Sequence, residues 1–339
     1  KRGYLAFYII KRLIYLIPAL VVLTILVFLI LHLTPGEPAL AILGEHATKE
    51  SIEKVRKNLG LDKPVYMQYL IFLKKILKGN FGTSIKSDRP VLTEFIERFP
   101  ATVELATVSM IFAVILGIAA GVISATYRYS IFDYATMSFS VAGLSIPVFW
   151  FGLILIYTFA VKFELLPVSG RLSYEYYINN VTGLYLVDSL IGKDYGAFID
   201  ALKHIIMPAF VLASIPMSII ARITRSSMIN VLMEEYVKTA YAKGCSTIRV
   251  VIVHALKNAM IPVITVIGLM LGSLFAGAIL TETTFSWPGI GKWIVNAVYQ
   301  RDFPVIQGAT IIIAVIFILL NLIVDIVYTF LNPRITFRK

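Results

Sequence analysis

Long apolar stretches alternate with polar ones along this chain. Stretches long enough to cross about 30 Å of hydrocarbon as helices occur six times. They lie at roughly 13–33, 102–126, 135–161, 205–227, 258–280 and 305–330. The pattern predicts an all-α polytopic membrane protein with six transmembrane helices. An even number of crossings returns the chain to the side of the membrane on which it began.

The composition narrows the class of protein further. Of 339 residues, 58% are hydrophobic and only 15% are charged, an apolar share that a soluble domain does not need. The single cysteine, Cys245, excludes a disulfide framework and a cysteine metal cluster. The net charge of +11 does not indicate nucleic acid, because the cations lie at the ends of apolar stretches and not on an aromatic-rich basic face.

The positive charges predict the orientation, since lysine and arginine near membrane spans are retained in the cytoplasm. They gather at the N-terminus, in the turn between the second and third spans, around the polar interval 222–263 and in the tail. These cations are Lys1, Arg2, Lys11, Arg12, Arg128, Arg222, Arg225, Lys238, Lys243, Arg249, Lys257, Arg334, Arg338 and Lys339. Both termini and the interval 222–263 are therefore expected to be cytoplasmic. The first apolar stretch has no small-residue cleavage site and is expected to stay as an anchor.

The expected domains follow from this topology. Residues 1–34 form the N-terminal segment and first transmembrane helix, 35–100 an extracytoplasmic helical subdomain, and 101–339 a five-helix core that contains a cytoplasmic loop at 222–257. In the subdomain, the pattern predicts one helix from a cap at Thr48 to a stop at Gly60, and a second from Pro64 to near Lys78. This subdomain and a second loop at 165–203 either receive a soluble partner or simply cap the helix bundle.

The polar interval 222–263 carries a helix-stop signal at its centre. Gly244 ends a short helical pattern, because a residue without Cβ takes the left-handed turn at low cost. Ser246 or Thr247 can then cap a new helix. The sequence predicts two short helices joined by a tight glycine turn.

For several residues inside the apolar stretches, a structural role is favoured over a functional one. The pairs Gly117/Gly121 and Gly268/Gly272 have the spacing that allows close helix contact in lipid. Pro147 permits a kink in the third span. Glu104 and Asp325 lie near span ends, where an ion pair or helix contact is favoured over a proton relay.

Catalytic and nucleotide-binding patterns are absent. The fragment Gly289–Lys292 resembles part of a phosphate-binding loop, but Ser286 stands where its first glycine belongs and Trp293 where a hydroxyl should bind magnesium. No Gly-x-Ser-x-Gly elbow occurs. The histidines show no spacing typical of metal ligands and are expected to be interfacial or structural; they are His32, His46, His204 and His254. The chain is therefore expected not to be an enzyme.

A set of short motifs, taken in order, resembles a known family. They are PGEP at 35–38, GNFGTS at 79–84, RFPATVELA at 98–106, GLSIPVFW at 143–150, LPVSG at 166–170, RITRSSM at 222–228, EYVKTAYAKG at 235–244, TETTFSWPGIGKW at 281–293, RDFPVIQG at 301–308 and DIVYTFLNPR at 325–334. Together they resemble the permease subunits of bacterial and archaeal ABC importers, specifically the B-type subunit of the dipeptide, oligopeptide and nickel group. The resemblance covers nearly the whole chain.

The family's cytoplasmic signature is Glu-Ala-Ala, three residues, Gly, nine residues and Ile-x-Leu-Pro. Here the triplet is Lys238-Thr239-Ala240, the glycine is Gly244, and His254-Ala255-Leu256-Lys257 replaces the last part. These departures resemble the peptide branch, where the signature is relaxed. The resemblance implies an ATPase-coupling loop made of Glu235, Tyr236, Lys238, Thr239, Ala240, Tyr241, Lys243, Gly244 and Ser246.

The resemblance also implies an assembly and a mechanism. The chain is expected in the cytoplasmic (inner) membrane of a bacterium or archaeon, as a heterodimer with a homologous second permease. Two ATPase subunits, which bind ATP and Mg²⁺, and an extracytoplasmic substrate-binding protein complete the machine. No cofactor is expected on this chain. Transport of di- or oligopeptides would proceed by alternating access, since ATP closure and substrate access bias the same two-state bundle.

Other functions stay open at this point. The same machinery can carry nickel chelates or glutathione, and a more distant alternative is a channel or scaffold that needs no ATPase. Candidates for the translocation path, which lipid or helix contacts would also explain, are Ser138, Ser140, Ser145, Pro147, Ser273 and Gly277. Candidates for a rigid external turn near the substrate entrance or the binding protein, or merely for a stiff loop, are Trp287, Pro288, Gly289, Arg301 and Asp302.

Overall fold

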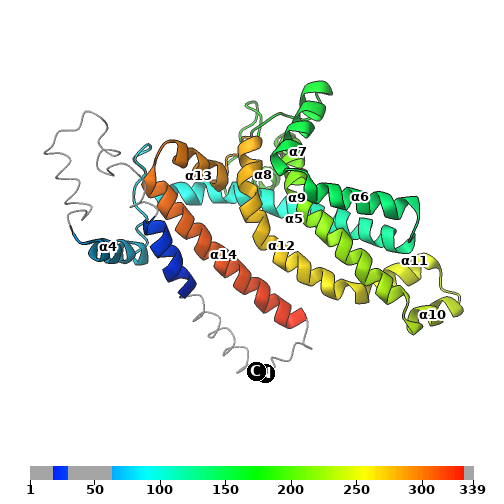
Figure 1. Ribbon diagram of the computed structural model, residues 1–339. Coiled ribbons are helices and arrows are strands. Elements are labelled where there is room, and N and C mark those ends of the chain that lie inside the picture. Colours follow the sequence, from blue (N-terminus) through cyan, green and yellow to red (C-terminus); the bar gives the residue numbers. More distant parts are fainter. Residues whose placement is uncertain (1–17, 30–62, 332–339) are drawn as a thin grey trace. The chain divides into compact units, whose positions relative to one another are not determined.

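The structure is a computed structural model that describes residues 18–29 and 63–331, the side chains of 276 and 324–331 excepted. Within these ranges the backbone forms helices, turns and one isolated antiparallel bridge between Thr83 and Pro90 (Figure 1). After a helix at Pro18–Leu29, the elements are α4 (Val65–Leu77), α5 (Val91–Thr126), α6 (Ile131–Ser145), α7 (Val148–Leu155), the π-helix η1 (Ile156–Lys162), α8 (Tyr185–Ile191), α9 (Tyr195–Leu232), α10 (Glu235–Ala242), α11 (Thr247–Arg249), the π-helix η2 (Val250–Ala255), α12 (Leu256–Thr284), α13 (Ile290–Tyr299) and α14 (Phe303–Leu331). The expected all-α fold is confirmed for the described residues.

Among the described residues, four helices are long and apolar enough to cross a membrane. They are α5, α9, the continuous helix Thr247–Phe275 and the part of α14 from Phe303 to Ile323. A fifth candidate is the bent pair of α6 with α7 and η1. The helix at Pro18–Leu29 is apolar but shorter, and the rest of the expected first span lies outside the described residues. Six crossings and cytoplasmic termini stay predictions.

The third expected span is not one straight helix. Its two halves, Ile131–Ser145 and Val148–Lys162, are bent by 111°, which is far more than the kink expected at Pro147. Ile146 takes an extended conformation with φ −79° and ψ 128°, as residues before proline prefer. Pro147, which has no N–H to continue the first helix, starts α7 by accepting the N–H of Phe151 at 3.0 Å.

A core of small and branched apolar residues joins α5, α9 and α12. At Gly117 an added Cβ would lie 2.9 Å from the carbonyl oxygen of Met217, and at Gly121 it would lie 2.5 Å from Cβ of Thr224. The expected close helix contact is therefore confirmed for this pair of glycines, and it joins α5 to α9. Gly272 is buried and Gly268 partly buried on α12, and their contact stays a prediction.

The helix expected from Pro64 is confirmed as α4, with Pro64 at its N-cap and Lys78 at its C-cap. The rest of that subdomain is less completely described. The PGEP motif at 35–38, the helix expected between Thr48 and Gly60, and the cations at both chain ends lie outside the described residues.

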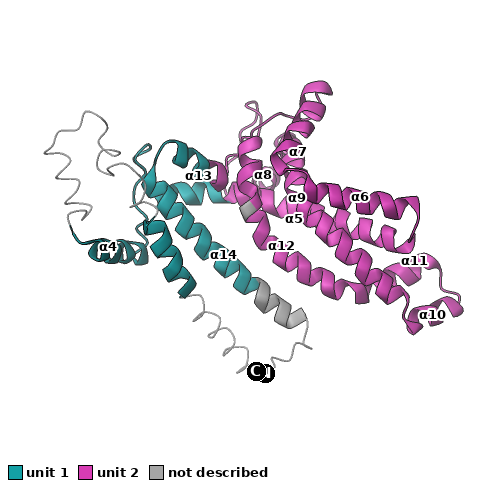
Figure 2. Ribbon diagram, in the orientation of Figure 1, with its two compact units in different colours: residues 1–99, 293–323 teal, residues 100–292, 324–339 magenta. Residues whose placement is uncertain are grey.

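The chain divides into two compact units, which are described separately (Figure 2). Unit 1 holds residues 1–99 and 293–323, and unit 2 holds 100–292 and 324–339. In unit 1, Val91, Ala297 and Val305 share one buried apolar cluster. Residues 293–323 therefore group with residues 1–99 in unit 1, and the division at residues 34 and 100 that the sequence suggests stays a prediction.

Candidate functional site

The expected glycine turn follows the long helix α9. Residues Glu235–Ala242 form α10, and Gly244 has the left-handed φ of +79°. The N–H of Cys245 reaches back to the carbonyl of Ala240 at 3.2 Å, which closes the turn. Ser246 is then the extended residue before α11, although its side chain makes no capping hydrogen bond. The first short helix and the glycine turn are confirmed, but the second helix is not short, because Thr247 begins the continuous helix that runs to Phe275 and passes Pro262.

One face of α10 is fixed and the other is open. Val237 and Ala240 are buried against Val250 of η2. The other residues expected to couple to an ATPase are all exposed, and these are Glu235, Tyr236, Lys238, Thr239, Tyr241, Lys243, Gly244 and Ser246. The turn therefore presents polar and aromatic side chains on a rigidly held helix.

Internal contacts involve only part of that open face. Lys238 Nζ pairs with Glu235 Oε1 at 2.7 Å, and both side chains are more than half exposed, so the pair contributes little to stability. The Tyr236 hydroxyl accepts from Asn258 Nδ2 at 2.7 Å and donates to the carbonyl of His254 at 3.4 Å. Tyr236 is thereby oriented from both sides.

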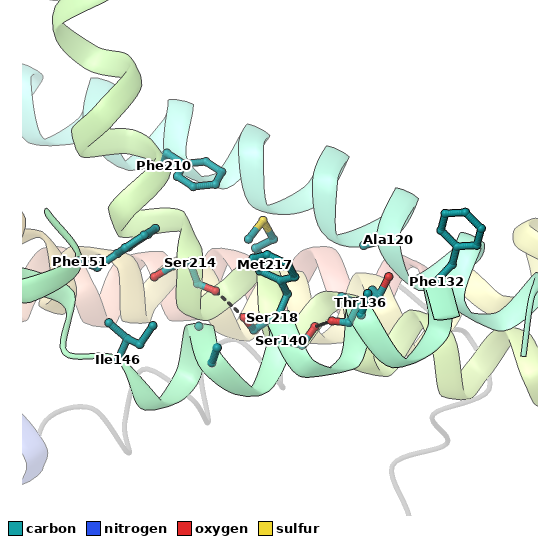
Figure 3. Close-up of a pocket in the computed structure, with 15 residues that line it drawn as sticks. Ala120, Phe132, Thr136, Ser140, Ile146, Phe151, Phe210, Ser214, Met217 and Ser218 are labelled. Carbon is teal, nitrogen blue, oxygen red and sulfur yellow. Dashed lines mark hydrogen bonds between the residues drawn. The ribbon is translucent and has the colours of Figure 1, made fainter. Parts of the chain in front are cut away.

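A cavity of about 420 Å³ lies within unit 2 beside the break between α6 and α7 (Figure 3). Its wall is mostly apolar and comes from α5, α6, α7 and α9. The residues that line it are Ala120, Phe132, Ala135, Thr136, Phe139, Ser140, Ala142, Gly143, Ile146, Phe151, Phe210, Ser214, Met217, Ser218 and Ala221. Besides Thr136, the polar residues in this wall are three serines, Ser140, Ser214 and Ser218.

Each of those serine hydroxyls donates to its own helix. Ser140 Oγ donates to Thr136 O at 2.9 Å, Ser214 Oγ to Val211 O at 2.8 Å and Ser218 Oγ to Ser214 O at 2.8 Å. Their lone pairs stay available as acceptors. Of the residues expected along the translocation path, only Ser140 is part of this wall. The others lie outside it, with Ser138, Ser145 and Pro147 exposed on the α6–α7 segment and Ser273 and Gly277 on α12.

A second polar site surrounds the first helical turn of unit 2, at Ala101–Glu104. The indole N–H of Trp287 donates to the carbonyl of Ala101 at 2.8 Å, and Trp287 is only 1% exposed. The hydroxyl of Thr102 donates to Glu282 Oε1 at 2.6 Å and accepts the N–H of Ile290 at 2.9 Å. One turn of α5 thus binds both the end of α12 and the start of α13.

The same turn carries a buried ion pair. Arg171 donates through Nε and Nη2 to Glu104 Oε2 at 3.0 and 2.6 Å, and both residues are buried. The guanidinium carbon also lies 3.8 Å from the ring centre of Tyr185, a cation–π contact. Glu104 accepts the N–H of Leu186 at 2.8 Å. The ion pair favoured for Glu104 is therefore present, and its partner comes from the loop before α8.

Glu282 explains the two glycines of the WPGIG segment. Its carboxylate accepts the N–H of Lys292 at 3.0 Å, and a Cβ at Gly289 would overlap it. A Cβ at Gly291 would lie 2.7 Å from the Cα of Ile279. Burial raises the pKa of Glu282 to about 7, although hydrogen bonds from Thr102 and two backbone N–H groups act to lower it. Glu282 lies beyond the apolar window Thr247–Phe275.

The residues expected in an external turn fall into both units. Trp287, Pro288 and Gly289 belong to unit 2, and Arg301 and Asp302 to unit 1. In unit 1, the buried Asp302 accepts the hydroxyl of Ser84 at 2.5 Å and the N–H of Ile85 at 3.2 Å, so it ties GNFGTS to RDFPVIQG. The burial of Trp287 and Asp302 supports stiffness, and contact with a partner stays a prediction.

His204 has a carboxylate neighbour that the sequence reading did not identify. Its Nδ1 lies 3.3 Å from Asp200 Oδ2, one helical turn away. Asp200 in turn accepts the N–H and hydroxyl of Ser173 at 2.7 and 2.8 Å, which attaches the loop before α8 to α9. Within the described residues, no group of three or more His, Cys, Asp or Glu is placed to hold a metal.

Sequence reasoning missed these polar sites because their members are far apart along the chain. Glu282 and Thr102 are 180 positions apart, and Arg171 and Glu104 are 67. The signal that pointed toward them was motif content, since RFPATVELA and TETTFSWPGIGKW each carry an acid and small residues among apolar ones.

Comparison with known proteins gives the family. The family described as binding-protein-dependent transport system inner membrane component matches residues 117–337, and its N-terminal component matches residues 5–106. The chain is 48% identical to the permease protein of a di/tripeptide transport system from Pseudomonas aeruginosa, covering 98% of this chain and 99% of that one.

Two further relatives are permeases named for dipeptide and for glutathione transport. The dipeptide transport system permease protein of Escherichia coli K12 is 47% identical over 98% of this chain and 99% of its own length. The glutathione transport system permease protein of E. coli O1:K1 is 40% identical over 98% and 99%. The chain belongs to the family of binding-protein-dependent transport system inner membrane components.

Proposed function

We propose that this chain is the transmembrane permease subunit of an ATP-binding-cassette importer that moves di- or oligopeptides across the cytoplasmic membrane of a bacterium or archaeon. Near full-length identity of 47–48% to permeases named for dipeptide or di/tripeptide transport carries the proposal. The chain supplies the path, and separate subunits supply the energy. It acts beside a homologous second permease, two ATPases that bind ATP and Mg²⁺, and an extracytoplasmic binding protein.

The exposed face of α10 supports the coupling part of this proposal. Tyr236 and Tyr241 are exposed on a helix whose other face is buried through Val237 and Ala240. Aromatic side chains on a rigid support are typical anchors of protein interfaces. We assign this face to the ATPase contact, so that closure of the ATPases moves α10 together with the end of α9. Alternating access follows if the two states of the bundle bind the ATPases differently.

Glutathione is the alternative cargo that a specific observation favours, because a glutathione permease is also 40% identical. Peptide is preferred on the higher identity to the dipeptide systems. Nickel chelates stay a third possibility from the family resemblance. All three cargoes would use the same fold and partners, so only transport distinguishes them.

The test is uptake by the complete complex. The chain, its second permease, the ATPases and the cognate binding protein are reconstituted in liposomes, and ATP-dependent uptake of a labelled dipeptide is measured. We expect uptake of the labelled dipeptide. Excess unlabelled dipeptide should abolish this uptake, and glutathione or a nickel chelate should not. Uptake competed only by glutathione would move the assignment to the alternative cargo. Solute flux through the chain alone, without ATPases, would contradict the importer.

A further inference from the structure

A partly buried ion pair connects α6 to the last part of α9, shortly before Glu235–Ser246, which is called the coupling turn below. Arg225 donates through Nε to Asp133 Oδ1 at 2.6 Å and through Nη2 to Asp133 Oδ2 at 2.7 Å. The Asp133 side chain is 3% exposed and the Arg225 side chain 25%. A two-pronged contact of this kind fixes direction as well as distance. The two helices are therefore held in one relative orientation at this point.

Asp133 also fixes the turn that precedes α6. Its carboxylate accepts the hydroxyl of Ser124, near the end of α5, and the N–H of Tyr129 at 3.0 Å. Tyr129 has φ of +64°, a conformation that a residue with a side chain adopts only where its surroundings impose it. The carboxylate of Asp133, at the start of α6, therefore binds groups from the end of α5, from the turn and from Arg225 of α9.

The helices around this ion pair differ in how closely they are packed. α5 and α9 touch backbone to side chain at Gly117 and Gly121, so they form a tight pair. α6 approaches α9 at Gly143, where an added Cβ would lie 2.6 Å from Ser218 Oγ. The cavity extends along this interface, with Thr136 and Ser140 on one wall and Met217 on another (Figure 3), and Gly143 and Ser218 are part of its lining. α6 is thus attached to α9 at two points, one within the cavity wall and the other at Asp133, next to the lining residue Phe132.

The arrangement also connects Arg225 to the coupling turn. α9 ends at Leu232 and α10 begins at Glu235, so only Met233 and Glu234 separate them. The hydroxyl of Ser227 donates to the carbonyl of Ala259 at 2.8 Å, which holds this part of α9 to α12. A displacement of α10 therefore reaches Arg225 through about two turns of continuous helix.

We propose that the Asp133–Arg225 ion pair is a positioning device that makes α6 follow α9 when the coupling turn moves, and that it thereby sets the width of the cavity in each state of the transport cycle. The inference rests on the proposed function and adds a route from the ATPase contact to the transport path. Arg225 and Asp133 are positioning residues. They act through α6 and touch no cargo.

The test uses the complete complex in liposomes and two conservative variants. Arg225→Lys keeps the charge but loses the two-pronged contact, and Asp133→Asn keeps the shape but loses the charge. Arg128→Lys is the matched control, because Arg128 is exposed in the same turn and its guanidinium lies over the ring of Tyr129. The readout is the number of dipeptides taken up per ATP hydrolysed, which a purely structural role would leave unchanged in complexes that assemble.

We expect Arg225→Lys and Asp133→Asn to hydrolyse ATP while their dipeptide-to-ATP ratio falls about tenfold, a typical size for coupling between sites. Arg128→Lys should keep the wild-type ratio. Spin labels at Thr136→Cys and Met217→Cys, in a Cys245→Ser background, should show a distance change on ATP binding that is lost with Arg225→Lys. An unchanged ratio, or failure of both variants to assemble, would overturn the proposal. Absence of uptake in the wild-type complex would instead contradict the proposed function.

Discussion

The first turn of unit 2 and the coupling turn are both short polar segments, yet they are built in opposite ways. At Ala101–Glu104, the neighbouring polar groups of Trp287, Glu282 and Arg171 are buried and hydrogen-bonded. At Glu235–Ser246, the polar side chains are exposed. The comparison teaches that buried partners within the chain determine stability at the first segment. The second segment contributes little stability and leaves its side chains available to another subunit.

Removing one charge of the buried pair should have the largest effect on stability. With Arg171→Leu, Glu104 loses its cationic partner while remaining buried, and such changes cost about 3–5 kcal/mol. We expect the purified protein in detergent to unfold at a clearly lower temperature. Arg249→Leu, at an exposed site near the coupling turn, serves as the control and should unfold close to the wild type. Equal unfolding temperatures for the two variants would remove the contrast between the segments.

Glu282→Gln should change how stability depends on pH. The folded-state pKa of Glu282, about 7, is above its ordinary value of 4.5. Its contribution to the free energy of unfolding is therefore fully present below about pH 4.5 and is lost as pH rises to about 7. Each unit of difference corresponds to about 1.4 kcal/mol. The unfolding temperature, measured across this range, should fall as pH rises in the wild type and should fall less steeply in Glu282→Gln.

Asp188 does not obscure that measurement. Although burial raises its pKa, hydrogen bonds from the hydroxyl and backbone of Thr182 and from the backbone of Gly183 and Val181 lower it below the ordinary value of 3.8. Stability from Asp188 is therefore lost only as pH falls below that value. Parallel pH curves for wild type and Glu282→Gln would show that the pKa of Glu282 is the same in the folded and unfolded states.

Gly244→Val should separate stability from coupling. Gly244 has φ of +79°, and no atom lies within 4 Å of an added Cβ, so the main cost of the change is about 1–2 kcal/mol of backbone strain. We expect an inserted, folded protein whose ATP hydrolysis no longer drives uptake. Gly170→Val is the matched control, because Gly170 has φ of +88° and equally open space. Uptake lost in both variants would attribute the effect to strain alone.

Lys238→Met should have the smallest effect on stability. Its pair with Glu235 is exposed, and such pairs contribute about 0–1 kcal/mol. The unfolding temperature should hardly change, while binding of the ATPase subunits, measured by co-purification, should weaken if Lys238 lies in their interface. A large fall in unfolding temperature would mean that the coupling turn stabilises the chain as strongly as the Ala101–Glu104 turn.

Local signals in the sequence predicted local structure well. The Gly244 stop, the helix that starts at Pro64 and the break at Pro147 each depend on the backbone of one or two residues, and the sequence pattern contains that information. The size of the break at Pro147 was not predictable. It depends on where α7 packs, against Phe285 and Val211, and not on the proline alone.

Contacts between distant segments were largely beyond the sequence pattern. Arg225 was placed only among the cytoplasmic cations, and its pairing with Asp133 was not predicted, because 92 residues separate the two and nothing in the hydrophobic pattern pairs an arginine with a particular acid. Of the residues that line the cavity, the sequence predicted only Ser140, for a similar reason. Its other side comes from α9, and the register between α6 and α9 is set by the contact of Gly143 with Ser218.

The overlap between Glu282 and Gly289 has a consequence for how this segment can vary among related sequences. At Gly289, the three atoms nearest to an added methyl group all belong to the carboxyl group of Glu282, so shortening residue 282 removes the closest overlap with alanine at 289. At Gly291, the methyl group also meets the backbone of Ile279, which no side-chain change relieves. Positions 282 and 289 should therefore change together, and position 291 should accept only glycine, whatever residues surround it.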